Sequence, residues 1–559
     1  MRELVVLNGS EARFRTSDAR DTSRPVVLIG FQQQGNLGIG YLTATLSRHG
    51  YHATAIDFQL DPADILDRIR ALNPMLVGFS LIFQFYVEEF GALIRYLRDH
   101  GVHCHFTIGG HFPSLSYRET IELIPELDSV VRFEGEETLV ELADCLSSGR
   151  PWQHIHGIAY QSESGIIAQP LRHLVEDLDS LPYPAREFTP MAVLGHKIMP
   201  ILASRGCART CSFCSIHTFY RSAPGKVVRL RNPSAVVGEM KALHEERHIT
   251  IFLFQDDDFP LFGPSWRRWT MQLVDELYRQ NLVGKVLWKI NCRADAVDHD
   301  LFCRLRDAGL YIVYMGLESG SEDGLEILNK EVTVEENIRA VETLKRIGVM
   351  FQYGFMLFDP STTFESVRAN IAFLRRIVGD GSAAATFCRM LPYDGTPIKD
   401  ELKRAGRLRG DVCNPDYDFL DPRLGGYFEA LTGLLNVAGW IHGCRALSPQ
   451  LDWAWHEVAI LERLFPPLYT LDQYKEQLRT ITRESNDMLF TVVEEMARAH
   501  ERGTPNTWSE DKIESQCRTF IDRLLLKRNE FVYRHQDVLL QTLANKVEPS
   551  VPEGQSVLS

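Results

Sequence analysis

Three cysteines lie close together in the middle of the chain, directly after the apolar run 198–203. Cys207, Cys211 and Cys214 have the spacing C-x3-C-x2-C. This feature constrains the fold most, because three thiolates on one loop can hold an iron–sulfur cluster and leave one iron without a protein ligand. A structural zinc ion normally takes a fourth Cys or His, for which His217 is the near candidate, and three cysteines do not pair among themselves. The spacing therefore favours a 4Fe-4S cluster.

Composition places the chain among ordinary globular proteins, with 45% hydrophobic and 24% charged residues. Its 559 residues predict about three to four domains, and the net charge of −14 argues against a nucleic-acid-binding surface over the whole chain. No apolar run reaches the ~18 residues that span a bilayer, and the N-terminus does not resemble a signal peptide. Eleven cysteines, mostly isolated, fit a reducing compartment. We therefore expect a cytoplasmic protein that binds neither membranes nor nucleic acid.

Strand-like and helix-like segments alternate over residues 25–150, after an N-terminal extension at 1–24. Strands are predicted at Val26–Gly30, His52–Phe58, Met75–Ser80, His103–Ile108 and Ser129–Arg132. Such alternation predicts an α/β fold with a doubly wound, Rossmann-like parallel sheet. Ligands of these sheets bind beyond the carboxyl ends of the strands, which directs attention to the loops 31–38, 80–83, 109–114 and 133–137.

Glycines after the first predicted strand suggest a dinucleotide site, but their order is wrong. Gly35, Gly38 and Gly40 stand as G-x-x-G-x-G, although Asp57 lies near the expected acidic position. The pyrophosphate-binding fingerprint is G-x-G-x-x-G, in which each glycine has a defined place in the turn. We therefore do not expect NAD or FAD in this domain.

Residues 151–197 are predicted to form a linker with its own hairpin, and residues 198–397 a barrel. Six barrel strands are expected, at Met199–Ser204, Ile249–Gln255, Val286–Asn291, Tyr311–Leu317, Met350–Leu357 and Ala383–Met390. Six strand–helix units predict a partial (β/α)6 barrel that is open on one side. Barrel enzymes place their reactive groups at the carboxyl ends of the strands.

Polar residues follow several of these strands. Asp256, Asp257 and Asp258 follow the second strand, although acids at such positions are often helix caps. Arg293 follows the third strand, and Glu318 ends a largely apolar run at the fourth.

Other cysteines of this region, Cys292, Cys303 and Cys388, are expected to be small buried hydrophobes. After the barrel, residues 398–546 are predicted to be helical, with helices at Leu434–Ala446 and Trp453–Leu464. Their tryptophans are expected mainly in the core, although the domain can also cover the barrel mouth. The tail 547–559 is expected to be disordered.

The cysteine triplet, the Gly109-Gly110 pair and the turn Phe133-Glu134-Gly135-Glu136 together resemble the cobalamin-binding radical SAM enzymes, over about residues 25–397. In that family the cysteines hold a 4Fe-4S cluster that binds S-adenosylmethionine, and the upstream sheet binds cobalamin. The resemblance implies contacts to S-adenosylmethionine from Phe213, Asp257, Arg293, Glu318 and Ser319. It implies contacts to cobalamin from Gln33, Gly35, Ser80, Gly109, Gly110, Phe133, Glu134 and Gly135.

One motif of the family is absent. The Asp-x-His-x-x-Gly sequence, which supplies a histidine to cobalt, is replaced by Phe31-Gln32-Gln33-Gln34-Gly35. If cobalamin binds, we expect no histidine on its lower face. The alternative is a flavodoxin-like domain that has lost its cofactor and only packs against the barrel.

The resemblance implies methylation of an unactivated carbon of a small molecule in natural-product biosynthesis, through a 5′-deoxyadenosyl radical and methylcobalamin. A flavodoxin or ferredoxin would supply electrons. The alternatives are a cyclase or rearrangement enzyme that uses cobalamin without methyl transfer, and a non-catalytic corrinoid or redox sensor. Arg293 and Glu318 count against the sensor, because Arg293 suits the carboxylate of S-adenosylmethionine and Glu318 its ribose or amine. Methylthiolation is not expected, since the first domain contains only Cys104 and Cys145.

Overall fold

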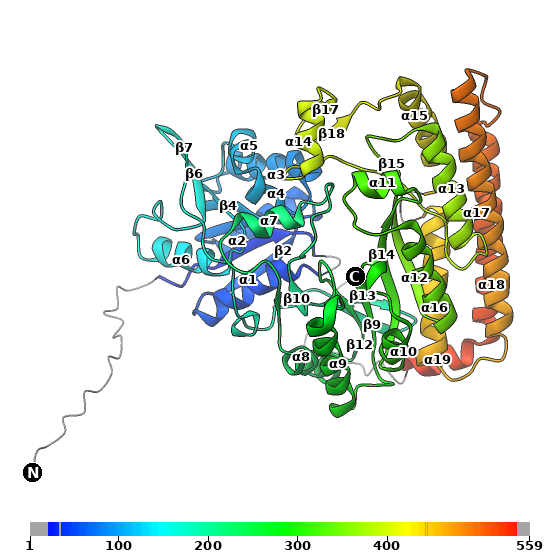
Figure 1. Ribbon diagram of the computed structural model, residues 1–559. Helices are drawn as coiled ribbons and strands as arrows, with labels where there is room; N and C mark the ends of the chain where they lie inside the picture. Colours follow the sequence, from blue (N-terminus) through cyan, green and yellow to red (C-terminus); the bar gives the residue numbers. More distant parts are fainter. Residues whose placement is uncertain (1–20, 33–34, 442, 444, 545–559) are drawn as a thin grey trace, which may run out of the picture.

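The protein consists of an N-terminal α/β unit, a half-barrel and a layer of long C-terminal helices (Figure 1). The computed structural model describes residues 21–32, 35–441, 443 and 445–544. Most of the predicted N-terminal extension, Gln33 and the predicted tail 547–559 lie outside these residues. None of the helices in the described part of the chain is both long enough and apolar enough to cross a membrane. The predicted fold class is confirmed by this architecture.

The first sheet has seven strands in the order β2-β1-β3-β4-β5-β6-β7. Its parallel strands are β1 (Val26–Gly30), β2 (Ala53–Asp57), β3 (Leu76–Ser80), β4 (His105–Gly109) and β5 (Ser129–Val131). The helices are α1 (Leu37–Arg48), α2 (Pro62–Leu72), α3 (Val87–Asp99), α4 (His111–Leu115), α5 (Tyr117–Leu123) and α6 (Glu136–Ser147). Side chains of α2 and α3 join one hydrophobic cluster and those of α1 and α6 another. Helices thus cover both faces, which is why the central strands are continuously apolar.

The predicted linker hairpin extends this sheet. Strands β6 (Ile158–Ser162) and β7 (Gly165–Ala168) pair antiparallel, and β6 also pairs antiparallel with β5. The sheet is therefore mixed at this edge and not wholly parallel as predicted. The hairpin satisfies backbone groups of β5 that would otherwise lie at an open edge.

The second sheet is a half-barrel with the order β16-β15-β14-β13-β12-β9-β8, parallel except for β8 on β9. Its strands are β8 (Met191–Val193), β9 (His196–Ile201), β12 (Ile249–Phe254), β13 (Leu287–Cys292), β14 (Leu310–Glu318), β15 (Met350–Phe358) and β16 (Cys388–Arg389). The helices between them are α8 (Pro233–Arg247), α9 (Gly263–Arg279), α10 (His299–Asp307), α11 (Glu322–Ile327), α12 (Val334–Ile347) and α13 (Phe364–Val378).

Two barrel strands differ from the predictions. The first, β9, ends at Ile201, and Ser204–Arg205 (β10) pairs separately with Arg229–Leu230 (β11). The sixth is only two residues long, because the segment before it bonds to the C-terminal helices. The Asn486 side chain accepts a hydrogen bond from the Ala385 nitrogen and donates one to the Ala383 oxygen.

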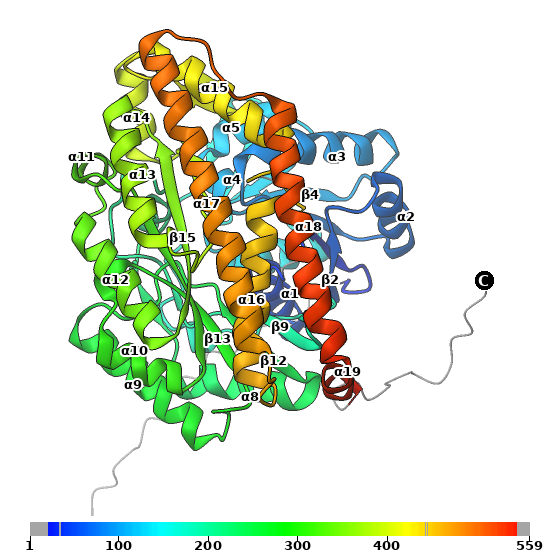
Figure 2. The same cartoon turned by 90° about the vertical axis from the view of Figure 1, so that its right-hand side faces the viewer.

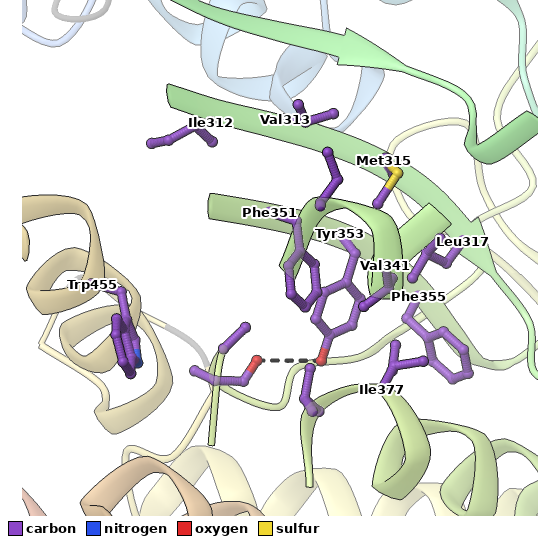
Figure 3. Packing of buried hydrophobic residues seen from close by; sticks show 14 of the residues in the cluster. Ile312, Val313, Met315, Leu317, Val341, Phe351, Tyr353, Phe355, Ile377 and Trp455 are labelled. Atoms are coloured by element: carbon purple, nitrogen blue, oxygen red, sulfur yellow. Dashed lines mark hydrogen bonds between the residues drawn. The ribbon is translucent and has the colours of Figure 1, made fainter. Parts of the chain in front are cut away.

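A hydrophobic layer fills the space between the outer face of the half-barrel and its helices. Val313, Met315 and Leu317 of β14 lie near Val341 of α12 (Figure 3). The residues between them on β14 face the other way, and Tyr314 is 38% exposed. The inner face of the half-barrel is therefore open to solvent at Tyr314.

The C-terminal region begins with α14 (Pro397–Arg404) and a small hairpin of β17 (Leu408–Gly410) and β18 (Pro415–Tyr417). This hairpin is not among the predicted elements. The helices α15 (Pro422–Val437), α16 (Leu447–Leu464), α17 (Leu471–Arg502), α18 (Glu510–Arg534) and α19 (Gln536–Ala544) follow. The helix predicted at Leu434–Ala446 is wrong, because Gly439 and Gly443 adopt positive φ angles of 65° and 94° and interrupt it.

Helices α16, α17 and α18 run side by side along one flank of the half-barrel (Figure 2). Helix α16 contacts β15, where the Gln352 amide donates to Asp452 at 2.6 Å. At its other end, the ring of Phe465 lies 5.4 Å from that of His196 on β9. Because β15 and β9 lie toward opposite edges of the sheet, α16 spans the open side of the half-barrel.

Candidate functional site

A cavity of about 300 Å³ lies between the first sheet and the half-barrel. From the first sheet, its lining includes Ser80, the Gly109–Gly110 pair and the turn 133–136. From the half-barrel, it includes Arg205 and Asp257. The cavity lies beyond the carboxyl ends of the first sheet's strands, where α/β sheets bind ligands.

Glycines allow the backbone to line this cavity closely. Gly110 has a φ of +109°, and a Cβ there would lie 2.3 Å from the Leu81 carbonyl oxygen. A Cβ at Gly78 would lie 2.8 Å from Leu28 Cδ2. Gly110, a predicted cobalamin residue, therefore stands where no larger side chain fits without a shift in the loop after β3. At Gly109, also predicted to contact cobalamin, a Cβ would lie 3.0 Å from the Val131 oxygen of β5.

The turn after β5 is tied to the loop after β4. Phe133 has a φ of +62°, and its nitrogen donates to the Ser114 hydroxyl at 2.7 Å. That hydroxyl donates in turn to the Gly110 oxygen at 2.6 Å. The two predicted cobalamin loops therefore form one hydrogen-bonded rim.

Glu134, also predicted to contact cobalamin, lines the cavity and bonds to the half-barrel and its approach. Its carboxylate accepts from Arg205 at 3.1 Å, from Arg229 at 2.8 Å and from the Val175 nitrogen at 2.6 Å. Arg205 also donates to Glu136 at 2.6 Å. Burial by itself raises the pKa of Glu134, but the two guanidinium groups and the hydrogen bonds lower it below its ordinary value. This buried charge cluster joins the first sheet to the strand that precedes the cysteine loop.

A second link joins the same two regions. The Nε2 of His111, directly after Gly110, lies 2.7 Å from the Ser215 hydroxyl, directly after Cys214. Burial lowers the pKa of His111 to about 4, so its ring is neutral near pH 7. The ring stacks on Phe219 of α7 (Ile216–Ser222) at 4.7 Å, and α7 packs beside α4 (Figure 1).

The cysteine loop begins at a glycine that no other residue can replace without strain. Gly206 has a φ of +91°, and a Cβ there would lie 1.9 Å from the Val227 oxygen. Its nitrogen donates to Asp257 at 3.0 Å. Burial raises the pKa of Cys207 to about 12 and that of Cys214 to about 11, with a smaller contribution from their neighbouring thiol and carboxyl groups.

All three cysteines of the loop are free thiols. Within the described ranges, no three His, Cys, Asp or Glu side chains converge as they do around a single metal ion. The donor set nevertheless fits an iron–sulfur cluster, because three thiolates on one loop are the ligands that such a cluster takes. Phe213, inside the loop, packs against the half-barrel core.

The three aspartates after β12 do not cap a helix, since α9 begins only at Gly263. Asp256 accepts from the Ser204 hydroxyl at 2.5 Å and from the Ala203 nitrogen at 3.3 Å. Burial raises its pKa to about 7, and the pKa values of Asp257 and Asp258 to about 6. Asp256 therefore holds the chain before the cysteine loop, and Asp257 both lines the cavity and fastens Gly206.

Arg293 lies beside the cysteine loop, with Nη1 at 3.9 Å from Cys211 Sγ. Its other nitrogens donate to Asp295 and to the carbonyl oxygens of Lys330 and Glu331. The guanidinium is thus already held in place. A bidentate pairing with the carboxylate of S-adenosylmethionine would have to replace some of these bonds.

Glu318 forms a buried ion pair that no sequence pattern predicts. Lys330 donates to its carboxylate at 3.0 Å, and both side chains are less than one-tenth exposed. Glu318 has a φ of +64°, and a Cβ at Gly316 would lie 2.1 Å from its Oε1. Ser319 is buried, and its hydroxyl donates to Asn370 at 3.2 Å. Lys330 carries no distinctive spacing, so no sequence signal points to it.

The inner face of the half-barrel carries further polar groups. Cys388, on the short strand β16, is exposed, which contradicts the predicted burial. Partial desolvation, and to a smaller extent the Glu318 carboxylate, raises the pKa of both Cys388 and Tyr314 to about 12. Glu318 and Tyr314 lie on β14 and Cys388 lies on β16, with β15 between the two strands.

Comparison with known proteins assigns families to two parts of the chain. Residues 31–143 match the model of the B12 binding domain, and residues 201–374 match the radical SAM superfamily. The chain is 28% identical to an uncharacterized methyltransferase of Pyrococcus horikoshii, over 65% of this chain and 77% of that protein. It is 27% identical to the anaerobic magnesium-protoporphyrin IX monomethyl ester cyclase of Rubrivivax gelatinosus, over 60% and 61%.

The fold is similar to that of the cobalamin-dependent S-adenosylmethionine radical enzyme OxsB, solved with aqua-cobalamin bound. The TM-score is 0.64 with 17% identity, and the match covers 94% of this chain and 83% of that one. The glycine rim of the cavity and the three-thiol loop lie within the regions that match the two family models.

Proposed function

The chain joins a B12-binding domain to a radical SAM domain, and on that basis we propose that it is a cobalamin-dependent methyltransferase acting on an unactivated carbon of a small molecule. We place it in natural-product biosynthesis, with a flavodoxin or ferredoxin as electron donor. The observation that supports this most is the pair of links between the two domains. Glu134 and His111 of the first domain bond to Arg205 and Ser215, which flank the cysteine loop.

Residues of both domains are suited to hold the cofactors. Gly109, Gly110 and the turn 133–135 would line the corrin. The buried Nε2 of Gln32, in the loop after β1, lacks a hydrogen-bond partner in the described part of the chain and is a free donor. Cys207, Cys211 and Cys214 would hold the cluster. When bound, the cluster and S-adenosylmethionine supply a 5′-deoxyadenosyl radical, and cobalamin supplies the methyl group.

The chain's own residues keep these sites fixed. The Glu318–Lys330 pair stands at the end of β14, where it can bond the ribose or amine of S-adenosylmethionine, with Asp257, Ser319 and Phe213 nearby in the proposed site. Arg293 holds the segment 330–331 against the cysteine loop. Buried charges that are already paired need little rearrangement during the reaction, which is how a preorganised site lowers a barrier.

A second candidate function is ring formation or rearrangement without methyl transfer. The sequence similarity to a cyclase favours this second function. The identity of 27% to the cyclase nearly equals the 28% identity to the uncharacterized methyltransferase. The two reactions differ in what becomes of the methyl group of S-adenosylmethionine.

The test uses the full chain reconstituted with iron, sulfide and cobalamin under strong reductant, together with an extract of small molecules and S-adenosylmethionine that carries a deuterated methyl group. Methyl transfer predicts a product that carries the label, together with S-adenosylhomocysteine. Formation of 5′-deoxyadenosine with an unlabelled product would favour the cyclase. Absence of both bound corrinoid and 5′-deoxyadenosine would exclude the proposed enzyme and leave only the redox sensor.

A further inference from the structure

Five polar side chains meet on the inner side of the half-barrel, below the level of the cysteine loop. Lys289, Tyr314 and Gln352 come from the adjacent strands β13, β14 and β15, and Asp452 and His456 come from α16. We call these five residues the floor. Asp452 and His456 lie one helical turn apart and so share a face of α16. The floor exists because α16 spans the open side of the half-barrel.

Neighbouring polar groups connect the floor to Glu318, at the carboxyl end of β14. Desolvation and, after it, the charge of Glu318 raise the pKa of Tyr314 and of Cys388. The Lys289 ammonium lies 5.4 Å from the centre of the Tyr314 ring. A molecule seated on the floor would therefore extend along the inner face toward the cysteine loop and the cavity.

Most acceptors on the floor already have donors. Asp452 accepts from the Gln352 amide at 2.6 Å, and His456 Nε2 lies 2.8 Å from the Tyr311 hydroxyl. Burial and the charge of Lys289 lower the pKa of His456 to about 4, so it adds no charge near neutral pH.

The donors, in contrast, lack acceptors. In the described part of the chain, the Lys289 ammonium makes no hydrogen bond or ion pair, and the Tyr314 hydroxyl makes no hydrogen bond. An ammonium has three N–H groups to place, and the half-buried Lys289 and the exposed Tyr314 have theirs free for a ligand on the inner face. An anionic acceptor group would satisfy these donors.

The charge balance limits what that anion can be. Burial raises the pKa of Asp452 to about 6, and Lys289 and Gln352 oppose this rise. Asp452 is thus largely ionised above neutral pH and lies near enough to Lys289 to shift its pKa. One cation beside one anion favours a ligand group with a single negative charge over a doubly charged phosphate.

We propose that the floor anchors a carboxylate group of the substrate, through Lys289 and the Tyr314 hydroxyl. The rest of the substrate extends along the inner face of the half-barrel, so that its reacting carbon lies near the cysteine loop. This assignment rests on the proposed function, because it treats the inner face as the substrate site. It adds the substrate's chemical class, an organic carboxylic acid.

The test measures binding to the reconstituted protein by calorimetry near pH 8, with benzoate, benzamide and phenyl phosphate as probes of similar shape. We expect benzoate to bind and benzamide to bind at least about tenfold more weakly, which corresponds to 1.4 kcal/mol. Equal binding of benzoate and benzamide, or tighter binding of phenyl phosphate, would overturn the carboxylate assignment.

Variants locate the site. Lys289→Met should weaken benzoate binding by about tenfold or more, whereas Lys285→Met, an exposed lysine just before the same strand, should leave it unchanged. Asp452→Asn should tighten benzoate binding, a gain that misfolding does not imitate. Equal benzoate affinity in Lys289→Met and Lys285→Met, or weaker affinity in Asp452→Asn, would contradict the proposal.

The experiments distinguish a failure of the carboxylate site from a failure of the proposed function. A wild-type protein that binds benzoate through Lys289 but forms no 5′-deoxyadenosine under reductant refutes the enzyme and not the carboxylate site. A wild-type protein that forms 5′-deoxyadenosine while Lys289→Met binds benzoate normally refutes only the site.

Discussion

Glu134, in the turn after β5, accepts a hydrogen bond at 3.1 Å from Arg205, which lies two residues before Cys207. The two residues are 71 positions apart in sequence, and both side chains are at most one-tenth exposed. This buried ion pair connects the rim of the first sheet's cavity to the base of the cysteine loop, together with the Arg205–Glu136 pair and the His111–Ser215 hydrogen bond. These links help to fix the relative position of the two proposed cofactor sites.

Glu134→Gln should destabilise the protein by about 3 kcal/mol, because removing one partner of a buried charge cluster leaves the other charges uncompensated. Arg205 and Arg229 would both lose a carboxylate partner. Equilibrium unfolding in urea measures the change. Glu137→Gln is the control, since Glu137 is 72% exposed and its ion pair with Arg172 is at the surface. Equal stability of the two variants would show that the buried cluster is not structural.

Gly110→Ala should reduce the affinity for cobalamin by about tenfold or more. The added Cβ would lie 2.3 Å from the Leu81 oxygen and force the loop after β3 to move. Gly101→Ala is a matched control, because Gly101 also has a positive φ, of +83°, but has no atom within 4 Å of the added Cβ. Corrinoid absorbance of the loaded proteins measures the difference. Cobalamin retained equally in both variants would argue against a cradle at Gly110.

Asp256→Asn should gain stability relative to the wild type as the pH rises. The pKa of Asp256 is raised from 3.8 to about 7, so the folded state holds a proton that the unfolded state loses. The wild type is therefore penalised increasingly from about pH 4 to about pH 7, whereas Asn does not titrate. Between about pH 5 and pH 8 the difference in unfolding free energy should move by about 2–3 kcal/mol toward the variant. Urea unfolding at the two pH values measures this, and a pH-independent difference would mean that Asp256 is ionised in the folded protein.

Lys330→Met and Glu318→Gln should each destabilise the protein, by about 3 kcal/mol for the loss of one member of a buried pair. The double variant should cost much less than the sum, because neither charge is then left alone. Unfolding free energies of the four proteins complete the cycle. Additive effects would show that the two side chains do not depend on each other.

The same variants test the proposed contact with S-adenosylmethionine. Calorimetric titration of the cluster-loaded proteins should show weaker binding of this cofactor in Glu318→Gln than in the wild type. Unchanged affinity would remove Glu318 from the proposed site and leave it a structural role.

The sequence was informative where a function depends on local spacing. The cysteine triplet, the Gly109–Gly110 pair and Glu318 all stand at strand ends that apolar runs make visible. The first sheet and the half-barrel were predictable for the same reason. Hydrophobic periodicity and the turn residues that end each segment are properties of neighbouring residues.

Long-range partners were not predictable. Arg205 and Lys330 carry no pattern, and their roles become evident only when the fold brings them to Glu134 and Glu318. Lys289 is a single charge within the predicted strand 286–291, and its neighbour Asp452 comes from a helix far along the chain. Cys388 was wrongly expected to be buried, because the length of β16 depends on bonds to α17.

The central claim, that the chain uses a cluster and cobalamin together on S-adenosylmethionine, is tested most directly by counting two products. The reconstituted protein, under reductant and with a methyl-accepting substrate, should form 5′-deoxyadenosine and S-adenosylhomocysteine in about equal amounts, because each turnover would use one molecule of S-adenosylmethionine for the radical and one for the methyl group. Cys211→Ala should form no 5′-deoxyadenosine. Formation of S-adenosylhomocysteine alone, or 5′-deoxyadenosine formed equally by Cys211→Ala, would contradict the account.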